Sequence, residues 1–295
     1  MKKMNAKGYS ICSLCRYIGI SPQAYYKRLH QSNSSNNLYN KMEEVVKKNR
    51  VSKSRAGLRT IYYKENLSSL LGLNQFEKQM SYRGYALKPY KSFIKTTDSR
   101  GHQYKFDNLI SGKEVNGTNQ VIVGDITYYM HSSGLYYIFH FADIYSLEIK
   151  GLLGSKNMEG ENAIKCMRQI MKYNGQNKYG HKLIVHTDGG GQYRSHDFQS
   201  MIRKAEITPS HAKSCFENGL AERINGVLKN EYLIDYNIKN EKQLNRALKQ
   251  IQEQSNNIWP SKKLGYRTPR QYADWTKMLK PEERPVIIIK AIQKS

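Results

Sequence analysis

The chain has 295 residues, and its 48 Lys and Arg against 24 Asp and Glu give a formal net charge of +24. Such an excess of cations indicates a polyanionic partner, with nucleic acid as the default. The four cysteines are scattered, which argues against a disulfide scaffold and for a reducing compartment. The longest C-terminal apolar run, residues 286–289, is far too short to span a bilayer, and no signal peptide opens the chain. We therefore expect a cytoplasmic protein with no membrane contact.

The N-terminal residues read as two short helices joined by a tight turn. Helices are predicted over residues 9–17 and 22–29, with Ser21 as the N-cap and Pro22 at the first helical position. The pattern is typical of a helix-turn-helix that binds DNA, although a small structural hairpin has the same pattern. The polar residues 31–38 are predicted to be a linker.

Two cysteines in the first helix have the spacing of a zinc-ligand pair. Cys12 and Cys15 are separated by two residues, but no second Cys or His pair follows at the spacing of a zinc finger. We therefore favour two buried positions on one helix face over a metal site.

A second helical module follows, with helices predicted near residues 38–50, 56–66 and 74–83, the last capped by Asn74. Its surface carries many cations suited to phosphate contacts, although such a face can also simply be solvated. These cations are Arg50, Lys53, Arg55, Arg59, Lys64, Lys78 and Arg83. Residues 88–118 lack periodicity and are predicted to be an extended linker. Residues 1–118 carry a net charge of +15, and the rest of the chain carries +9.

From residue 121 the pattern changes to alternating strands and helices. The first three runs, residues 121–129, 135–145 and 146–153, predict an antiparallel meander. They are followed by a helix at 159–173, a strand at 182–188, a helix at 195–205, a strand at 207–210 and a helix at 217–232. This order predicts an α/β, RNase H-like core with a mixed five-stranded sheet, preceded by all-helical modules.

The last of these helices has an apolar face and a polar stripe. Asn218, Glu222, Asn225 and Lys229 line up along the stripe, and Glu222 is the acid in its middle. Taken alone, this is an ordinary amphipathic helix. Together with acids on two upstream strands, Asp125 and Asp188, it predicts a site for a divalent metal, because hard cations prefer carboxylate oxygens.

Five segments together resemble a known family. They are residues 125–128, 143–146, 186–193, 218–223 and 264–269. The chain resembles the integrase core of bacterial insertion-sequence transposases of the DDE type, the OrfB-like group related to retroviral integrases. The resemblance covers residues 40–275.

The resemblance implies that Asp125, Asp188 and Glu222 are the catalytic triad and the metal ligands. Two Mg²⁺ or Mn²⁺ ions would serve each site, with Asp125 bridging them, Asp188 on one ion and Glu222 on the other. Asp143 is the competing acid, and we favour a structural hydrogen-bond role for it. His186 either orients the substrate or fills the sheet.

DNA contacts are expected beside the triad and on the helical module. The candidates are Lys229, Asn218, Asn225, Arg223, Arg59, Lys78 and Arg83. Two departures from the family pattern stand out. Only 33 residues separate Asp188 from Glu222, slightly fewer than usual, which we attribute to a shorter loop at 213–218, and Ile122 occupies the place of a usual Trp.

The family would make this protein a transposase that binds terminal inverted repeats, cuts double-stranded DNA and joins it to target DNA. The expected assembly is a homo-oligomer, at least a dimer on paired ends, nucleoid-associated, with a helix-turn-helix protein from an upstream frame as a further partner. The alternatives are an RNase H-like nuclease without strand transfer and a DNA-binding regulator derived from a transposase. The predicted division is a helix-turn-helix module (1–36), a second helical module (37–90), a linker (91–118), the catalytic core (119–235) and a helical C-terminal extension (236–295).

Overall fold

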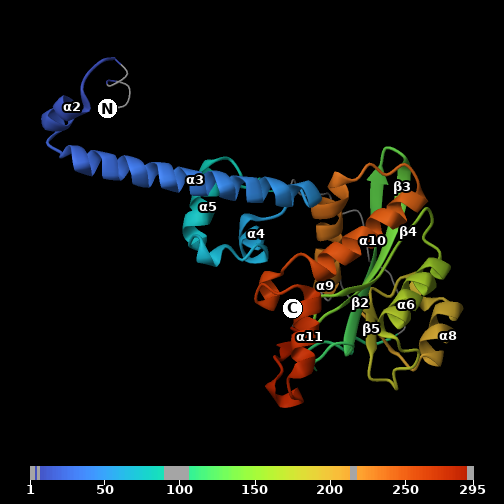
Figure 1. Ribbon diagram of the computed structural model, residues 1–295. Coiled ribbons are helices and arrows are strands. Elements are labelled where there is room, and N and C mark those ends of the chain that lie inside the picture. The colour runs from blue at the N-terminus through green and yellow to red at the C-terminus, as the bar shows by residue number, and fades with distance from the viewer. Residues whose placement is uncertain (1–3, 5–6, 90–105, 213–217, 291–295) are drawn as a thin grey trace, which may run out of the picture.

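A long helix joins a small N-terminal hairpin to the rest of the molecule in the computed structural model, which describes residues 4, 7–89, 106–212 and 218–290. Helix α2 (Ile11–Ile18) is followed by α3 (Pro22–Ser52), which runs outward from the core and carries α2 at its far end (Figure 1). The Ser21 hydroxyl accepts a hydrogen bond from the backbone N–H of Ala24. The predicted N-cap and the helical hairpin are therefore confirmed.

The predicted linker at residues 31–38 is wrong, because this segment lies inside α3. No Gly or Pro interrupts the chain between Pro22 and Gly57. Ser and Asn disfavour a helix by only about 0.5 kcal/mol each relative to Ala, so a polar run without breakers continues a helix that is already formed. The C-terminal half of α3 supplies that stability, since Met42 and Val46 are buried. The predicted boundary between two helical modules thus falls within one helix.

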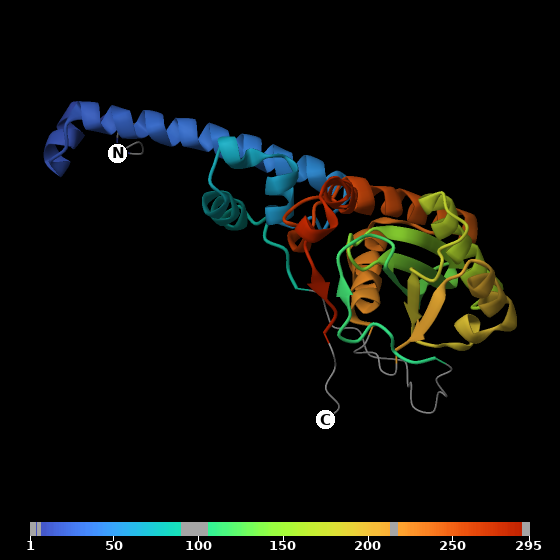
Figure 2. The same cartoon turned by 90° about the horizontal axis from the view of Figure 1, so that it is seen from below.

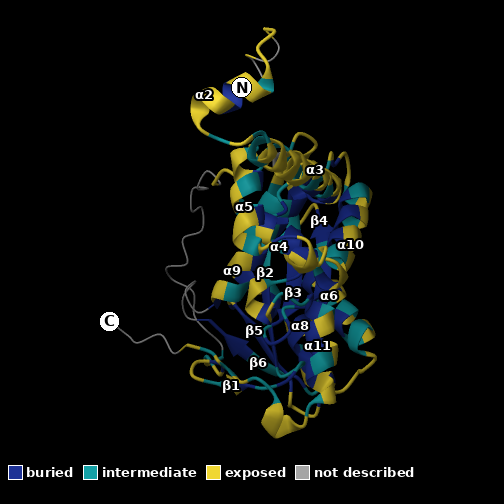
Figure 3. Ribbon diagram, turned by 60° about the vertical axis from the view of Figure 1, so that its left-hand side comes forward, coloured by how far each residue is buried: buried dark blue, intermediate teal, exposed yellow. Residues whose placement is uncertain are grey.

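The α2 helix is largely exposed, as its colouring in Figure 3 shows. Leu14 and Cys15 are buried, but Cys12 is exposed. The expectation that both cysteines occupy buried positions is therefore correct for Cys15 and wrong for Cys12. Cys12 lies at the first turn of the helix, one turn before Cys15.

The second helical module is built from the C-terminal half of α3, α4 (Leu58–Lys64), the 3₁₀ turn η1 (Leu67–Ser69) and α5 (Leu73–Tyr82). Ile61, Phe76 and Met80 are fully buried between these elements. The N-cap of α5 is Gly72 and not the predicted Asn74, so this helix has no side-chain cap.

The segment before the sheet is not a free linker where the structure describes it. Residues 90–105 lie outside the described part. Beyond them, Ile110 and Val115 are buried, and β1 (Glu114–Val115) pairs antiparallel with β7 (Ile287–Ile288) near the C-terminus. The predicted linker is therefore wrong for residues 106–118, because these residues pack against the C-terminal segment.

The core is a mixed five-stranded sheet, as predicted. Its strands are β2 (Val121–His131), β3 (Gly134–Asp143), β4 (Ile149–Ser155), β5 (Ile184–Thr187) and β6 (Thr208–His211). They are arranged in the order β4-β3-β2-β5-β6. The first three form the predicted antiparallel meander, and β5 and β6 add to β2 in parallel.

Helices cover both faces of the sheet (Figures 1 and 2). One face packs on α6 (Gly160–Asn174), α7 (Gly191–Arg194) and α8 (His196–Lys204), and the other packs on α9 (Gly219–Val227) and α10 (Glu241–Asn257). Successive side chains of β3 point to opposite faces of the sheet. Phe139 packs with α6, α7 and α8, and Ile138 packs with α9 and α10. Gly124 on β2 lies so close to Phe141 that a Cβ atom there would be 2.2 Å from the ring. Glycine permits this contact.

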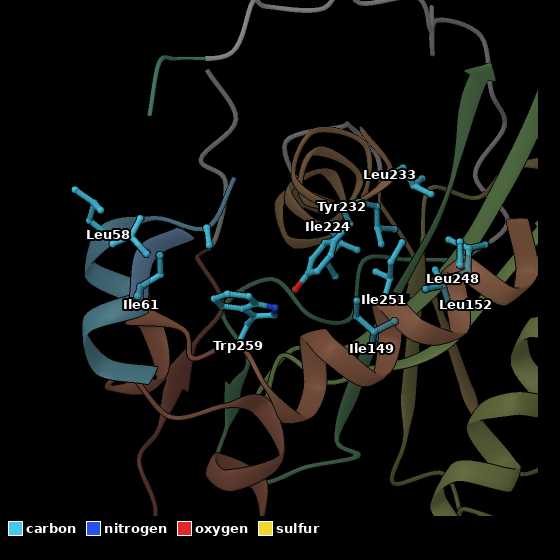
Figure 4. Packing of buried hydrophobic residues seen from close by; sticks show 14 of the residues in the cluster. Leu58, Ile61, Ile149, Leu152, Ile224, Tyr232, Leu233, Leu248, Ile251 and Trp259 are labelled. Carbon is cyan, nitrogen blue, oxygen red and sulfur yellow. The ribbon is translucent and has the colours of Figure 1, made fainter. Parts of the chain in front are cut away.

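An aromatic side chain lies at the contact between the helical module and the α/β core. Trp259, just after α10, lies between Leu58 and Ile61 of α4 on one side and Tyr232 and Ile251 of the core on the other (Figure 4). The chain then forms η5 (Lys262–Leu264), α11 (Pro269–Met278) and η6 (Pro281–Glu283).

An ion pair strengthens the same junction. The ammonium of Lys53, which follows α3, is 2.7 Å from Glu231 Oε2 and lies 4.3 Å from the centre of the Tyr232 ring. The backbone N–H of Ser54 donates to the Asp235 carboxylate at 2.9 Å. These acceptors lie in η3 (Leu228–Tyr232), a π-helical turn, and η4 (Leu233–Asp235), which directly continue α9. No helix in the described ranges is long and apolar enough to cross a membrane.

Candidate active site

Two of the predicted acids lie at the same edge of the sheet. Strands β2 and β5 run parallel with Val123 opposite His186. Asp125 and Asp188 each come two residues later, Asp125 within β2 and Asp188 just after β5, and neighbouring strands are about 4.8 Å apart. The strand register thus brings the two carboxylates side by side.

Asp188 lies in a turn that depends on glycine. Its Oδ1 accepts a hydrogen bond of 3.0 Å from the backbone N–H of Gly190. Gly189 has φ +73°, and a Cβ atom there would lie 3.0 Å from the His211 ring. The run of glycines after Asp188 therefore allows β5 to turn sharply into α7 and leaves the Asp188 side chain exposed.

Helix α9 supplies the third acid. Glu222 lies in its first turn and is exposed. Two asparagines bind this helix to β2: Asn218 Nδ2 donates to the Gly124 carbonyl at 3.1 Å, and Asn225 Nδ2 donates to Asp125 Oδ2 at 2.7 Å. The helix that carries Glu222 is thereby held against the strand that carries Asp125. The preceding residues 213–217, including Cys215 and Glu217, lie outside the described part.

The other two carboxylates raise the pKa of Asp125. Burial, the charge of Asp188 and, to a smaller extent, the charge of Glu222 together raise this pKa to about 7. Hydrogen bonds from the Ile126 backbone and Asn225 act in the opposite direction. Burial also raises the pKa of Tyr193, with Asp188 and Asp125 contributing. The site is therefore rich in negative charge that a cation would neutralise.

The donor set suits a hard divalent cation. Carboxylates on β2, just after β5 and on α9 lie near enough for the charges of two of them to raise the pKa of Asp125, and carboxylate oxygen is the ligand type that Mg²⁺ and Mn²⁺ prefer. Among the residues that the structure describes, no three acids, histidines or cysteines lie close enough together to hold one ion. The chemistry of the site fits a divalent metal, although the side chains are farther apart than bound ligands would be.

Two predicted DNA contacts have other partners. Asn218 is buried, and Asn225 uses its amide nitrogen on Asp125 and its carbonyl oxygen on His140, 2.8 Å from Nε2. Asn218 is thus used within the protein, and the Asn225 amide is engaged at both ends. Both asparagines bind the helix to the sheet.

The cations predicted to contact DNA differ in whether they are paired within the protein or exposed. Arg59 forms two hydrogen bonds with Glu77, and Arg83 pairs with Glu43 at 2.8 Å, so both guanidinium groups are used within the module. Arg223 and Lys78 are exposed. The Lys229 ammonium lies 4.9 Å from the centre of the Tyr128 ring, after α9 has changed to a π-helical turn.

Asp143 and His186 have structural roles. Asp143 is fully buried and accepts backbone hydrogen bonds from Asn119, Tyr145 and Ser146 at 2.6–3.0 Å. His186 is also buried, with Nδ1 2.9 Å from the Ser210 hydroxyl on β6. The structural interpretation of Asp143 is thus confirmed, and His186 fills the sheet.

Sequence reasoning missed two residues at the site. His140 on β3 lies directly opposite Asp125 in the β2–β3 pair, and the buried Tyr193 of α7 lies close enough for the charges of Asp125 and Asp188 to affect its pKa. A polar residue in the apolar run 135–145 was the only signal for His140.

The sheet order, with an antiparallel meander extended by two parallel strands, defines an RNase H-like α/β core. Two family models, both described as "Integrase core domain", match residues 115–214 and 203–269, which together span more than half of the chain. The transposase for insertion sequence element IS904 of Lactococcus lactis is 26% identical over 211 residues, covering 70% of this chain and 82% of that protein.

Further relatives include Transposase InsF for insertion sequence IS3A of Escherichia coli, 31% identical over 108 residues, or 36% of each chain. Among solved structures, the HTLV-2 integrase catalytic core domain in complex with magnesium is 23% identical with a TM-score of 0.43, covering 56% of this chain and 99% of that chain. On the family models and the transposase relatives, the chain belongs to the DDE-type transposase enzymes of insertion sequences, in the integrase core family.

Proposed function

We propose that the protein binds the terminal repeats of an insertion sequence, cleaves DNA at the element ends and joins the freed 3′-hydroxyl to a target or partner strand. The observation that supports this most strongly is the arrangement of three acids from separate elements. Asp125 lies within β2, Asp188 just after the neighbouring parallel strand, and Glu222 on the helix bonded to β2. A DNA substrate also implies that the protein works at the bacterial nucleoid.

We assign Asp125, Asp188 and Glu222 as the catalytic acids and metal ligands. Asp125 is central, because both other carboxylates raise its pKa. Asp125 would be shared between two ions, with Asp188 on one and Glu222 on the other. When bound, two Mg²⁺ or Mn²⁺ ions supply charge that favours the attacking oxygen and the leaving oxygen of an in-line displacement.

The chain's own residues then have three tasks at this site. Asp188 is exposed and held by its glycine turn, so it can meet an incoming ion and the scissile phosphate together. Glu222, on an exposed part of α9, would supply the third carboxylate to the ions. The asparagines of α9 keep this helix against β2.

DNA contacts are divided between the core and the helical modules. Near the acids, Lys229 and Arg223 are the cations available for the phosphate backbone, and Lys78 is exposed on α5. We assign recognition of the terminal repeats to residues 1–118, whose net charge is +15. The guanidinium groups of Arg59 and Arg83 are paired with Glu77 and Glu43, so their main role is to stabilise the helical module.

We infer that the active species is at least a dimer on paired ends. A nuclease needs only water as its nucleophile, whereas end joining brings a 3′-hydroxyl and a second phosphodiester to one site. One set of three carboxylates serves one end at a time, so two ends require two chains. A helix-turn-helix protein from an upstream frame would be a further partner.

The test is cleavage of DNA carrying the element's terminal repeats in Mg²⁺, with the full chain and with Asp125→Asn, Asp188→Asn and Glu222→Gln. Each substitution replaces a charged carboxylate with a neutral amide of similar size. We therefore expect cleavage to fall at least 100-fold while DNA binding changes little. Asp143→Asn is unsuitable as a control, since Asp143 is buried in a structural network. Asp197→Asn, at an exposed acid on α8, is the matched control and should cleave normally. Cleavage without joined products would favour the nuclease alternative, and binding without cleavage would favour the regulator.

A further inference from the structure

A buried histidine is connected to the central acid of the site through one side chain. His140 is the direct cross-strand partner of Asp125 in the antiparallel β2–β3 pair. Asn225 of α9 lies over both: its Nδ2 is 2.7 Å from Asp125 Oδ2, and its Oδ1 is 2.8 Å from His140 Nε2. Three elements, β3, β2 and α9, therefore meet in one hydrogen-bonded chain.

The direction of these hydrogen bonds follows from chemistry. An ionised carboxylate can only accept, so Asn225 must present its NH₂ group to Asp125. The amide oxygen then faces His140 and can only accept, so His140 must carry its proton on Nε2. One arrangement of the amide and one tautomer of the imidazole satisfy both contacts.

The surroundings of His140 indicate that its main role is to donate the Nε2–H hydrogen bond to Asn225. The side chain is fully buried, and its neighbours on the same face of β3, Ile138 and Ala142, are apolar. The Nδ1 atom has no hydrogen-bond partner in the described part of the chain, and burial lowers the pKa of His140 to about 4, so the ring is neutral. An imidazole in an apolar position with one nitrogen unsatisfied costs stability, whereas its other nitrogen orients Asn225.

We propose that Asn225 and His140 are positioning residues, which hold the Asp125 carboxylate in the orientation that receives the metal ions. This rests on the proposed function, because it takes Asp125 as a metal ligand. Asn225 occupies one of the roughly four lone-pair positions of the carboxylate and leaves the others for ions. It also lies one turn after Glu222 on α9, so the same hydrogen bond fixes the helix that carries the third acid. His140 keeps the Asn225 amide from rotating.

The first test measures metal binding without DNA. Mn²⁺ is titrated into the full chain, and free Mn²⁺ is counted by electron paramagnetic resonance. We expect Asn225→Leu and His140→Leu to weaken Mn²⁺ binding about tenfold, the usual size of the effect when an outer partner of a ligand is lost. His140→Gln should recover most of the affinity, since the Gln amide can donate from a position near that of Nε2. Ile138→Ala, two residues before His140 on the same face, controls for loss of packing and should bind Mn²⁺ normally.

A second measurement detects the hydrogen bond between His140 and Asn225 directly. In protein labelled with ¹⁵N only in histidine, His140 should show the Nε2–H tautomer, and Asn225→Leu should remove this preference. In the cleavage assay, the Leu variants should need more Mg²⁺ for half-maximal rate and bind end DNA as before, whereas a folding defect would lower the rate at every Mg²⁺ concentration.

The outcomes separate this inference from the proposed function. If Asp125→Asn abolishes Mn²⁺ binding but the Asn225 and His140 variants bind normally, the positioning role is wrong and the site assignment stands. If Asp125→Asn itself leaves Mn²⁺ binding intact, the proposed function fails. Equal loss in His140→Gln and His140→Leu would also overturn the role assigned to the donor.

Discussion

The junction between the helical module and the catalytic core includes one ion pair, and a double-mutant cycle can measure its contribution. The pair is Lys53 with Glu231, and their side chains are 9% and 28% exposed. The Lys53 ammonium also faces the rings of Tyr232 and Trp259, at 4.3 and 5.5 Å from their centres. Because the two partners differ in exposure, the two single substitutions should differ in effect.

Removing one partner of a buried pair typically costs about 3–5 kcal/mol, because an uncompensated charge stays behind. Glu231→Gln leaves the more buried Lys53 cation with only aromatic neighbours, and we expect a loss of about 3 kcal/mol. Lys53→Met removes the cation, keeps the apolar stem and leaves Glu231, which has access to water. We therefore expect a loss of about 1 kcal/mol for Lys53→Met and a coupling energy in the double variant of about 2 kcal/mol.

Urea unfolding of the wild type, the two single variants and the double variant, followed by far-ultraviolet circular dichroism, gives these free energies. The matched control is Lys165 with Glu161, an exposed pair one helical turn apart on α6. Its cycle should give a coupling below about 0.5 kcal/mol. If Lys53→Met costs more than Glu231→Gln, or if both pairs couple equally, the inference that burial makes the junction pair strong is wrong.

Three further predictions concern packing, pH and salt. Gly124→Ala should destabilise the protein by about 2 kcal/mol or more in a thermal melt, because its Cβ would lie 2.2 Å from the Phe141 ring; Gly226→Ala on α9, where nothing lies within 4 Å, should be neutral or stabilising. Hydrogen bonds from Lys47, Arg83 and Tyr85 lower the pKa of Glu43 to about 2 from 4.5, so its contribution to stability is present above pH 4.5 and lost as pH falls toward 2. The difference in unfolding free energy between the wild type and Glu43→Gln should therefore shrink over that range. A difference that stays constant would contradict the lowered pKa of Glu43. Binding of end DNA should weaken steeply between 50 and 200 mM salt, given the net charge of +24, and a flat response would argue against phosphate contacts.

The sheet could be predicted because its strands are apolar runs with clear turns between them. The acids could be proposed as one site because they lie in short motifs on a strand, just after a strand and on a helix. His140 could not be placed, because its role depends on the β2–β3 register: a shift of one residue would turn its side chain to the opposite face. The chain 213–217, where a shorter loop was expected, lies outside the described part.

Two errors have a common physical origin. Residues 31–38 and 106–118 are polar and aperiodic, and local composition therefore indicated linkers. The first continues a helix whose stability comes from buried residues one or more turns later, at Met42 and Val46. The second is ordered by β1 pairing with β7, far along the chain. Neither source of stability can be read from the segment itself.

We propose that three carboxylates, on β2, just after β5 and on α9, form one metal-dependent site that both cuts and joins DNA. The most direct measurement incubates labelled element ends and target DNA with the full chain in Mg²⁺ and separates cleaved from joined strands. We expect both products to appear, both to need the metal, and Asp125→Asn, Asp188→Asn and Glu222→Gln each to abolish both. Joined product from Glu222→Gln at the wild-type rate, or joining without divalent metal, would contradict this proposal.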